Sequence, residues 1–307
     1  MAKLLYLTSA RYSGSTLFSL LLGSQEGIST IGERRKFYSK VVEPAGPAVY
    51  CSCGRRFVDC PHWQALLERY LALRGGGAGP VPREFTYFRS HANDKGWAVY
   101  NRLMTEAISR GIPPGYLPQS GRLRRLLREN ELLIKASLEL DGNEVFFDSS
   151  KPVEHGVFFS TSTELDVYNL WLIRDPRAQA VSALKYNDWT LAEAARRWIK
   201  VHERARRNLG RGNIPVLKVS YERFCREPGV VLEEINSFAD LRVEEWNMDF
   251  REQEMHVMGN YGTRRGKSSV ISERLEWVEK ISIAERRQLE GMLAGYTEYF
   301  SPSVPVA

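Results

Sequence analysis

Residues 3–23 read KLLYLTSARYSGSTLFSLLLG, and this segment sets the expected fold. The apolar run at residues 3–8 predicts a buried strand. Residues 16–22 predict a buried helix that ends at Gly23, and residues 28–31 alternate weakly, as expected of a second strand. Strand, loop, helix and strand in succession form the βαβ unit of a parallel sheet.

The composition of the whole chain fits a folded protein with a substantial core. The chain has 307 residues, of which 43% are hydrophobic and 11% aromatic. Its 43 lysines and arginines exceed its 37 aspartates and glutamates, which leaves a net charge of +6. This excess suits a polyanionic ligand, and it is equally compatible with a mildly basic solvated surface. The N-terminal apolar run is too short for a signal peptide, and no stretch reaches the roughly 20 apolar residues of a membrane span, so we expect a cytoplasmic protein.

Three further apolar segments extend the expected sheet, and each is followed by polar residues. The apolar segments lie at residues 145–147, 167–173 and 216–219. The polar residues after them are Asp148–Lys151, Arg174–Arg177 and Ser220–Glu222. Strands that are apolar throughout are typical of a parallel sheet with helices on both faces. Because ligands bind outside the carboxyl ends of such strands, we expect these polar residues to surround a site.

Residues 9–16, Ser-Ala-Arg-Tyr-Ser-Gly-Ser-Thr, occupy the predicted turn from strand to helix. Small residues there let backbone amides approach an anion, and the helix N-terminus favours negative charge. Ser9 and Gly14 stand in the two glycine positions of the triphosphate loop G-x4-G-K-[ST]. Ser15, however, replaces its lysine, which kinases and ATPases use on the β- and γ-phosphates. The loop is therefore poorly equipped for triphosphate chemistry; a simple turn before a buried helix is the alternative interpretation.

Five short motifs follow one another along the chain: Ser13–Leu17, Cys51–Gly54 with Cys60–Trp63, Asp148–Lys151, Leu172–Arg177 with Ser182, and Gly259–Tyr261 with Arg264 and Trp277. Together they resemble motifs of the sulfotransferase family. Each motif is short, but all five stand in the family's order. The resemblance extends over about residues 3–300 and leaves the middle of the chain unmatched.

The resemblance implies a P-loop-like three-layer α/β fold with a central parallel sheet and a mostly helical insertion. Residues 1–307 would form one sulfotransferase domain, with the insertion or cap at about residues 40–143 shaping the acceptor pocket. The implied reaction moves a sulfuryl group from 3′-phosphoadenosine 5′-phosphosulfate to an acceptor hydroxyl by in-line displacement and releases adenosine 3′,5′-bisphosphate. This chemistry requires no metal. The acceptor is a small molecule, a carbohydrate, a lipid or a peptide, and no nucleic-acid partner is expected.

Within that insertion, a glycine-rich run at residues 74–80 predicts a mobile surface loop. Residues 84–140 are expected to be mostly helical.

The resemblance also implies which residues bind the cofactor. The predicted set is Arg11, Tyr12, Ser13, Gly14, Ser15, Thr16, Arg174, Ser182, Tyr221, Gly259, Asn260 and Arg264. Arg174 and Ser182 would hold the 3′-phosphate, since arginine supplies forked donors and serine a hydroxyl. An exposed Arg174 paired with Asp175, beside a buried Ser182, is the structural alternative.

Tyr12 departs from the family pattern because it stands where the family usually has a cation. Arg11, one position earlier, would then reach the leaving phosphate as a catalytic residue. Alternatively, Tyr12, Arg174 or Arg264 shares this task. Tyr221 either flanks the adenine or belongs to the core.

Glu33 is the predicted catalytic base. It follows the second strand and so should face the same crevice, and the resemblance to protein-tyrosine sulfotransferases implies this role. A surface carboxylate paired with Arg34 or Arg35 is the alternative. His155 is the rival base, although a histidine satisfied within the fold explains it as well.

Three cysteines cluster at Cys51, Cys53 and Cys60, followed by His62, whereas Cys225 stands alone. The spacing C-x-C-x6-C-x-H is not a standard one for structural zinc, so we assign no metal ligands. Zinc, a disulfide and reduced packing thiols remain the three alternatives.

Two competing functions deserve comparison with the transferase. A P-loop-type nucleotide kinase is disfavoured by the missing loop lysine and by the pair Arg174 and Ser182. A non-catalytic nucleotide- or RNA-binding module would use the basic surface, but it would carry aromatic stacking motifs that we do not find. The basic segment of residues 191–209 is expected to be a helix with a solvated charged face, and binding of an acidic acceptor is the smaller alternative.

Overall fold

The computed structural model describes residues 1–44, 50–75, 79–83, 95–211 and 214–306. Its centre is a five-stranded sheet with the order β2-β3-β1-β4-β5, in which every neighbouring pair is parallel. The strands are β1 (Ala2–Thr8), β2 (Ile28–Gly32), β3 (Val145–Lys151), β4 (Leu165–Ile173) and β5 (Val216–Ser220). All five strands lie where the sequence predicts them, with ends that differ by a few residues.

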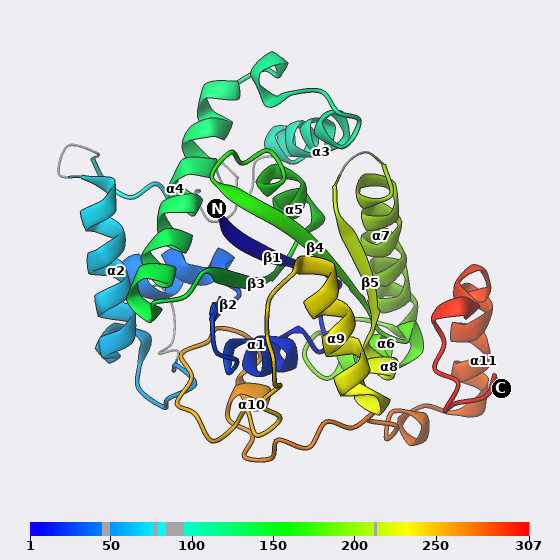
Figure 1. Ribbon diagram of the computed structural model, residues 1–307. Coiled ribbons are helices and arrows are strands. Elements are labelled where there is room, and N and C mark those ends of the chain that lie inside the picture. The colour runs from blue at the N-terminus through cyan, green and yellow to red at the C-terminus, as the bar shows by residue number, and fades with distance from the viewer. Residues whose placement is uncertain (45–49, 76–78, 84–94, 212–213, 307) are drawn as a thin grey trace.

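Helices cover both faces of this sheet because its side chains alternate between two cores. Leu4 and Tyr6 point into one core, and Leu5 and Leu7 point into the other. The helices on the first face are α4 (Ser120–Asp141), α5 (Val153–Phe159) and α7 (Leu191–Leu209), and those on the second are α1 (Ser15–Gly23), α8 (Tyr221–Arg226) and α9 (Pro228–Ala239). Figure 1 displays the resulting three layers, which confirm the predicted α/β class.

The region between β2 and β3 is helical in its described parts. It contains α2 (Pro61–Arg74), α3 (Lys95–Ser109) and α4. Glu129 on α4 accepts hydrogen bonds from Tyr70 and Arg74 on α2, at 2.6 and 2.8 Å, and these bonds join the two helices. Residues 76–78 of the predicted surface loop and residues 84–94 lie outside the described residues. In the part of the chain that is described, no helix is long and apolar enough to cross a membrane.

The chain connections open a crevice at the carboxyl edge of the sheet. The connection after β1 runs toward β2, whereas the connection after β4 runs toward β5 on the opposite side. Adjacent strands whose connections leave in opposite directions produce the crevice in which α/β proteins bind ligands.

The chain after α9 returns to this edge. Met258 adds an isolated parallel bridge at the end of β2, since its amide donates to the Ile31 carbonyl at 2.9 Å and its carbonyl accepts from the Glu33 amide at 3.3 Å. Gly32 makes this approach possible: it has a φ of +72°, and a Cβ there would lie 2.0 Å from the Met258 oxygen.

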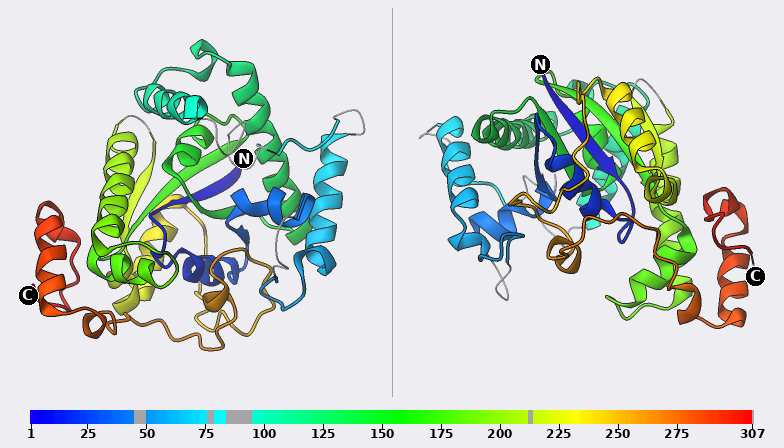
Figure 2. Two further views of the ribbon diagram at one scale, coloured as in Figure 1. Left: turned by 180° about the vertical axis from the view of Figure 1, so that it is seen from behind. Right: turned by 60° about the horizontal axis from the view of Figure 1, so that its bottom comes forward.

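The last part of the chain contains α10 (Tyr261–Arg264) and α11 (Ile283–Met292), and α11 packs against α6 (Pro176–Leu184) and α7 (Figure 2). Shorter 3₁₀ turns lie at Arg34–Lys36, Phe57–Asp59, Pro114–Tyr116, Val278–Lys280 and Ala294–Tyr299, and a π-helical turn lies at Tyr38–Val42.

Two residues of the Arg-Asp-Pro-Arg motif are structural. Asp175 is the N-cap of α6 and accepts a hydrogen bond from the Arg177 amide at 2.8 Å. The Arg177 side chain is fully buried, where it forms ion pairs with Asp175 at 2.8 Å and with Glu290 on α11 at 2.7 Å. It also donates to the Val304 carbonyl at 3.0 Å. This guanidinium therefore fastens the C-terminal part of the chain to α6.

We expect Arg177→Met to destabilise the protein strongly. The substitution leaves the buried Asp175 carboxylate without its cation and removes one of the two arginines paired with Glu290, and breaking such a buried pair typically costs about 3–5 kcal/mol. Urea unfolding measures it, with Arg196→Met on the exposed face of α7 as the control, which should stay within about 0.5 kcal/mol of the wild type. An unchanged unfolding midpoint for Arg177→Met would contradict this structural role.

Candidate functional site

A cavity of about 1510 Å³ lies at the carboxyl edge of the sheet. Its walls come from the loops after β1, β2, β3 and β4, from α6, and from the segment of residues 251–281. Two glutamates and ten cationic side chains line it; the cations are Arg11, Arg35, Lys36, Lys151, Arg174, Lys185, Arg251, Lys267, Arg274 and Lys280. The whole chain has a net charge of only +6, so the cavity concentrates positive charge well beyond the chain average. Such a field attracts a ligand with several negative charges.

The loop of residues 9–16 closes one end of the cavity. Gly14 is the N-cap of α1 and has a φ of +90°. The Tyr221 ring packs directly on it, because a Cβ at Gly14 would lie 2.3 Å from Cε2 of that ring. Ser15 and Thr16 begin the helix and line the cavity, and Thr16 Oγ1 accepts from the Asn260 amide at 3.0 Å. The N-terminus of α1 therefore faces the cavity, as an anion-binding site requires.

Arg174 and Ser182 line the same cavity, one from the end of β4 and one from α6. The Arg174 guanidinium donates from Nη1 to the Tyr12 carbonyl at 2.9 Å. It also lies 4.9 Å from the centre of the Tyr221 ring. Arg174 is thus held between the two loops while it remains part of the cavity wall.

Arg11 and Tyr12 both line the cavity but differ in how they are held. Tyr12 has a φ of +67°, its hydroxyl accepts from Asn187 at 2.7 Å, and its ring stacks on Tyr186 with 5.3 Å between centres. The Arg11 side chain is exposed, and its backbone carbonyl accepts from Gln179. The Arg11 side chain is therefore freer to change its conformation than that of Tyr12.

Arg264 and His155 are not brought to the cavity wall. The buried Arg264 guanidinium donates to the carbonyls of Tyr50 at 2.8 Å and Val257 at 3.2 Å, so it supports the segment that carries Gly259 and Asn260 instead of facing a ligand. Gly259 and Asn260 themselves line the cavity.

His155 is buried on α5, with its ring centre 6.5 Å from that of Tyr6. It lies among core residues of the first face and is absent from the lining of the cavity.

Glu33 lies in the cavity at the centre of a cluster of cations. Its carboxylate is 2.8 Å from Lys151 Nζ, 2.9 Å from Arg35 and 3.1 Å from Lys36. Burial by itself would raise the pKa of Glu33, but the three cations together hold it well below its usual range. The predicted pairing with Arg35 is thus present, whereas Arg34 is fully buried against Asp148 at 2.8 Å.

Lys151 also lines the cavity, although the sequence alone indicated no role for it. It ends β3, and its carbonyl accepts from the Ser9 amide at 3.2 Å, so it adjoins the first residue of the phosphate loop. Burial lowers the pKa of Lys151 to about 8, against the opposing attraction of Glu33. The available signal was its place in the polar run that follows an apolar segment, where Arg174 also lies.

The segment of residues 251–281 supplies cations whose place in the cavity no predicted strand or motif indicated. Arg251, Lys267, Arg274 and Lys280 belong to it and line the cavity. Among the described lining residues, none comes from residues 40–143. The expectation that the insertion shapes the acceptor pocket therefore stays a prediction, while the C-terminal segment supplies part of the described wall of this cavity.

The prediction for residues 191–209 is confirmed. They form α7, whose arginines at 196, 197, 206 and 207 are exposed while Trp198 and His202 pack inward. The charged face of α7 is consequently a solvated surface.

Comparison with known proteins gives matches at the level of structure. No family model and no curated protein sequence matches the chain. Among solved structures, it is similar to a sulfotransferase domain from the curacin biosynthetic pathway, with 13% identity, a TM-score of 0.46, and coverage of 100% of this chain and 93% of that one.

It is also similar to a sulfotransferase domain from the olefin synthase of Synechococcus PCC 7002, with 13% identity, a TM-score of 0.38, and coverage of 99% and 90%. A sulfotransferase from Alicyclobacillus acidocaldarius matches with 12% identity, a TM-score of 0.38, and coverage of 96% of each chain. At these identities and TM-scores, the chemistry has to be argued from the residues of the cavity.

Proposed function

We propose that the protein is a sulfotransferase that moves a sulfuryl group from 3′-phosphoadenosine 5′-phosphosulfate to an acceptor hydroxyl. The observation that carries this proposal is the cavity itself, in which ten cations and two glutamates surround two separate anion-binding groups. One group is the N-terminus of α1 and the other is Arg174 with Ser182. A nucleotide with charged groups at both its 5′ and 3′ ends matches two such groups in one cavity.

The donor would lie across the ends of β1 and β4. Its 5′-phosphosulfate would accept hydrogen bonds from the backbone amides of residues 14–16 and from the hydroxyls of Ser15 and Thr16 at the start of α1. The sequence prediction for Ser13 needs correction, because this side chain is buried outside the cavity lining and donates to Ser9 Oγ at 2.9 Å. Its 3′-phosphate would lie against Arg174 and Ser182. Tyr221, which packs between Gly14 and Arg174, would flank the adenine.

The reaction breaks the bond between sulfur and the phosphate oxygen while the acceptor oxygen forms a bond to the same sulfur. Negative charge develops on the departing phosphate oxygen, so a cation there lowers the barrier. We assign this cation to Lys151, which adjoins Ser9 at the start of the phosphate loop, together with Arg11.

Glu33 would take the proton of the acceptor hydroxyl. In the cavity without a ligand its three cations make it a weak base, because they stabilise the ionised carboxylate. When the phosphosulfate brings its own negative charge to Lys151 and Arg35, that anion shares these cations and the pKa of Glu33 rises. Binding of the donor thereby prepares the base.

Adenosine 3′,5′-bisphosphate should raise the melting temperature of the protein more than ATP with magnesium does. A ligand at 100 times its Kd contributes about 2.7 kcal/mol to the stability of the native state. Differential scanning fluorimetry measures this shift. Gly14→Ala should abolish it, because the new methyl group collides with Tyr221, whereas Gly291→Ala, where a Cβ meets no atom within 4 Å, should retain it. A response to ATP alone would refute the proposed donor.

Glu33→Gln should lower turnover by about 10²–10⁴-fold, the usual contribution of a positioned base. The amide is almost isosteric with the carboxylate but accepts no proton, so binding of adenosine 3′,5′-bisphosphate should persist. The measurement is kcat with a model acceptor beside calorimetric titration of the nucleotide. Glu252→Gln, at an exposed carboxylate outside the cavity lining, is the matched control. Full activity of Glu33→Gln would remove Glu33 from the mechanism.

The rate should fall on the alkaline side with an apparent pKa of about 8 for Lys151. Lys151 carries its charge below that pH and loses it above, so stabilisation of the leaving group disappears as the pH rises. The profile of kcat/KM against pH tests this, and Lys151→Arg should move the alkaline limb upward because arginine stays protonated. Identical limbs in the wild type and in Lys151→Arg would contradict the assignment.

A further inference from the structure

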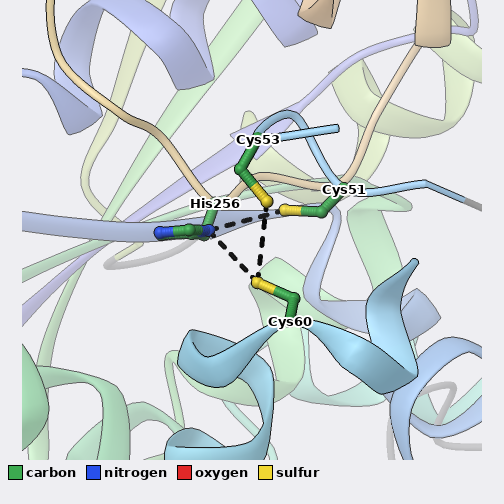
Figure 3. Close-up of side chains that lie close together, drawn as sticks. All are labelled: Cys51, Cys53, Cys60 and His256. Carbon is green, nitrogen blue, oxygen red and sulfur yellow. Dashed lines mark hydrogen bonds between the residues drawn. The ribbon is translucent and has the colours of Figure 1, made fainter. Parts of the chain in front are cut away.

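Three cysteines and a distant histidine meet at one point outside the cavity. Cys51, Cys53, Cys60 and His256 each offer one ligand atom, and these atoms all lie within 4.8 Å of one another. In Figure 3 the four side chains point toward a common centre, with Cys60 at the start of α2 and His256 on the segment that follows α9. Local folding of residues 51–60 cannot bring His256 there, so the cluster is a product of the tertiary structure.

Three of the distances between ligand atoms in the cluster match those of a tetrahedral zinc site. Zinc–sulfur bonds of about 2.3 Å and zinc–nitrogen bonds of about 2.0–2.1 Å place tetrahedral ligands about 3.8 Å apart for two sulfurs and about 3.6 Å apart for sulfur and nitrogen. The Sγ atoms of Cys53 and Cys60 are 3.7 Å apart. His256 Nδ1 lies 3.6 Å from Cys51 Sγ and 3.4 Å from Cys60 Sγ. All three cysteines are free thiols, and a disulfide would require about 2.05 Å between sulfurs.

The surroundings of these four residues suit thiolate ligands. The Trp63 indole donates to Cys51 Sγ at 3.2 Å, a hydrogen bond that stabilises negative charge on the sulfur. The cysteine loop is folded tightly, since the Cys51 amide donates to the Arg55 carbonyl at 2.8 Å and its carbonyl accepts from Gly54 at 3.1 Å. Cys51 and Cys60 are fully buried. Three thiolates and one imidazole complete a tetrahedral shell and leave no position for a substrate, as in structural zinc sites.

His62, which follows the cysteines in the sequence, is not one of the four clustered residues. Its ring stacks on that of His256 with 4.4 Å between centres and an angle of 10°. It therefore packs against the fourth ligand instead of serving as one.

The cluster holds the segment of residues 255–260 in place. The Ser52 hydroxyl donates to the Met255 carbonyl and accepts from the Val257 amide at 2.9 Å, so it fixes the backbone on both sides of His256. Directly after it, Met258 pairs with the end of β2, and the Asn260 amide donates to Thr16. A metal ion here would fasten one wall of the cavity from behind.

We propose that Cys51, Cys53, Cys60 and His256 bind one zinc ion, which fastens the segment of residues 255–260 against β2 and the phosphate loop. This site goes beyond the transfer reaction and does not depend on it. The ion has a structural role and takes no part in the proposed sulfuryl-transfer step.

Metal analysis of the full chain, purified without chelators, tests the site. Mass spectrometry of the elements should find about one zinc per chain. Cys60→Ser and His256→Ala should each reduce this content to near zero, whereas Cys225→Ser, which changes the cysteine outside the cluster, should retain it. Zinc-free chain that stays without zinc after incubation with the metal under reducing conditions overturns the proposal, as does full zinc content in both ligand variants.

A second measurement covers the case in which the ligand variants fail to fold. Reconstitution of the wild-type chain with cobalt should produce the thiolate charge-transfer bands and the intense visible bands of tetrahedral coordination, and zinc should abolish them. Hydrogen exchange at residues 255–260 should accelerate when the metal is removed, while exchange in α9 should not. Absence of the cobalt bands, or a Cys53–Cys60 disulfide in the purified chain, overturns the proposal. None of these readouts requires donor or acceptor, so their failure leaves the proposed transferase untouched.

Discussion

The pairing of β1 with β3 on one side and with β4 on the other is the constraint on which the site depends. Parallel strands bring their carboxyl ends to one edge, so the loops after them meet there whatever their separation in the chain. Lys151 consequently adjoins Ser9, and Arg174 reaches the backbone of Tyr12. Loss of this pairing would separate the N-terminus of α1 from Arg174 even if every helix remained intact.

Two groups of charges in this protein perform different tasks. Arg34 with Asp148, and Arg177 with Asp175 and Glu290, are buried pairs in which cation and carboxylate compensate each other. They hold elements together and leave little field outside. The cations of the cavity greatly outnumber its two glutamates, so the cavity keeps a positive field for a ligand. One short motif contributes to both groups, because Arg174 faces the cavity while Arg177 is buried behind it.

The segment after α9 connects the site to the periphery. Met258 extends the edge of the sheet beside β2, and residues 251–281 supply four of the ten cations of the cavity. This segment has little regular structure of its own, so its position depends on contacts with other parts of the chain. The cysteine cluster and Arg264 supply such contacts from behind. The segment of residues 251–281 therefore contributes both to the wall of the cavity and, through His256, to the proposed zinc site.

The sequence by itself determined the five strands and the helix α1, because hydrophobic runs and small-residue turns are local patterns. It also predicted that Arg174 and Glu33 face the crevice at the carboxyl edge of the sheet, since each comes within two residues of the end of a predicted strand. Only the tertiary structure shows that Lys151 pairs with Glu33 and that Arg264 and His155 lie outside the cavity lining. It also shows that His256, and not His62, lies within the cysteine cluster. Contacts between residues about 200 positions apart leave no trace in local spacing, because they arise from the order of the strands and the path of the chain around the sheet.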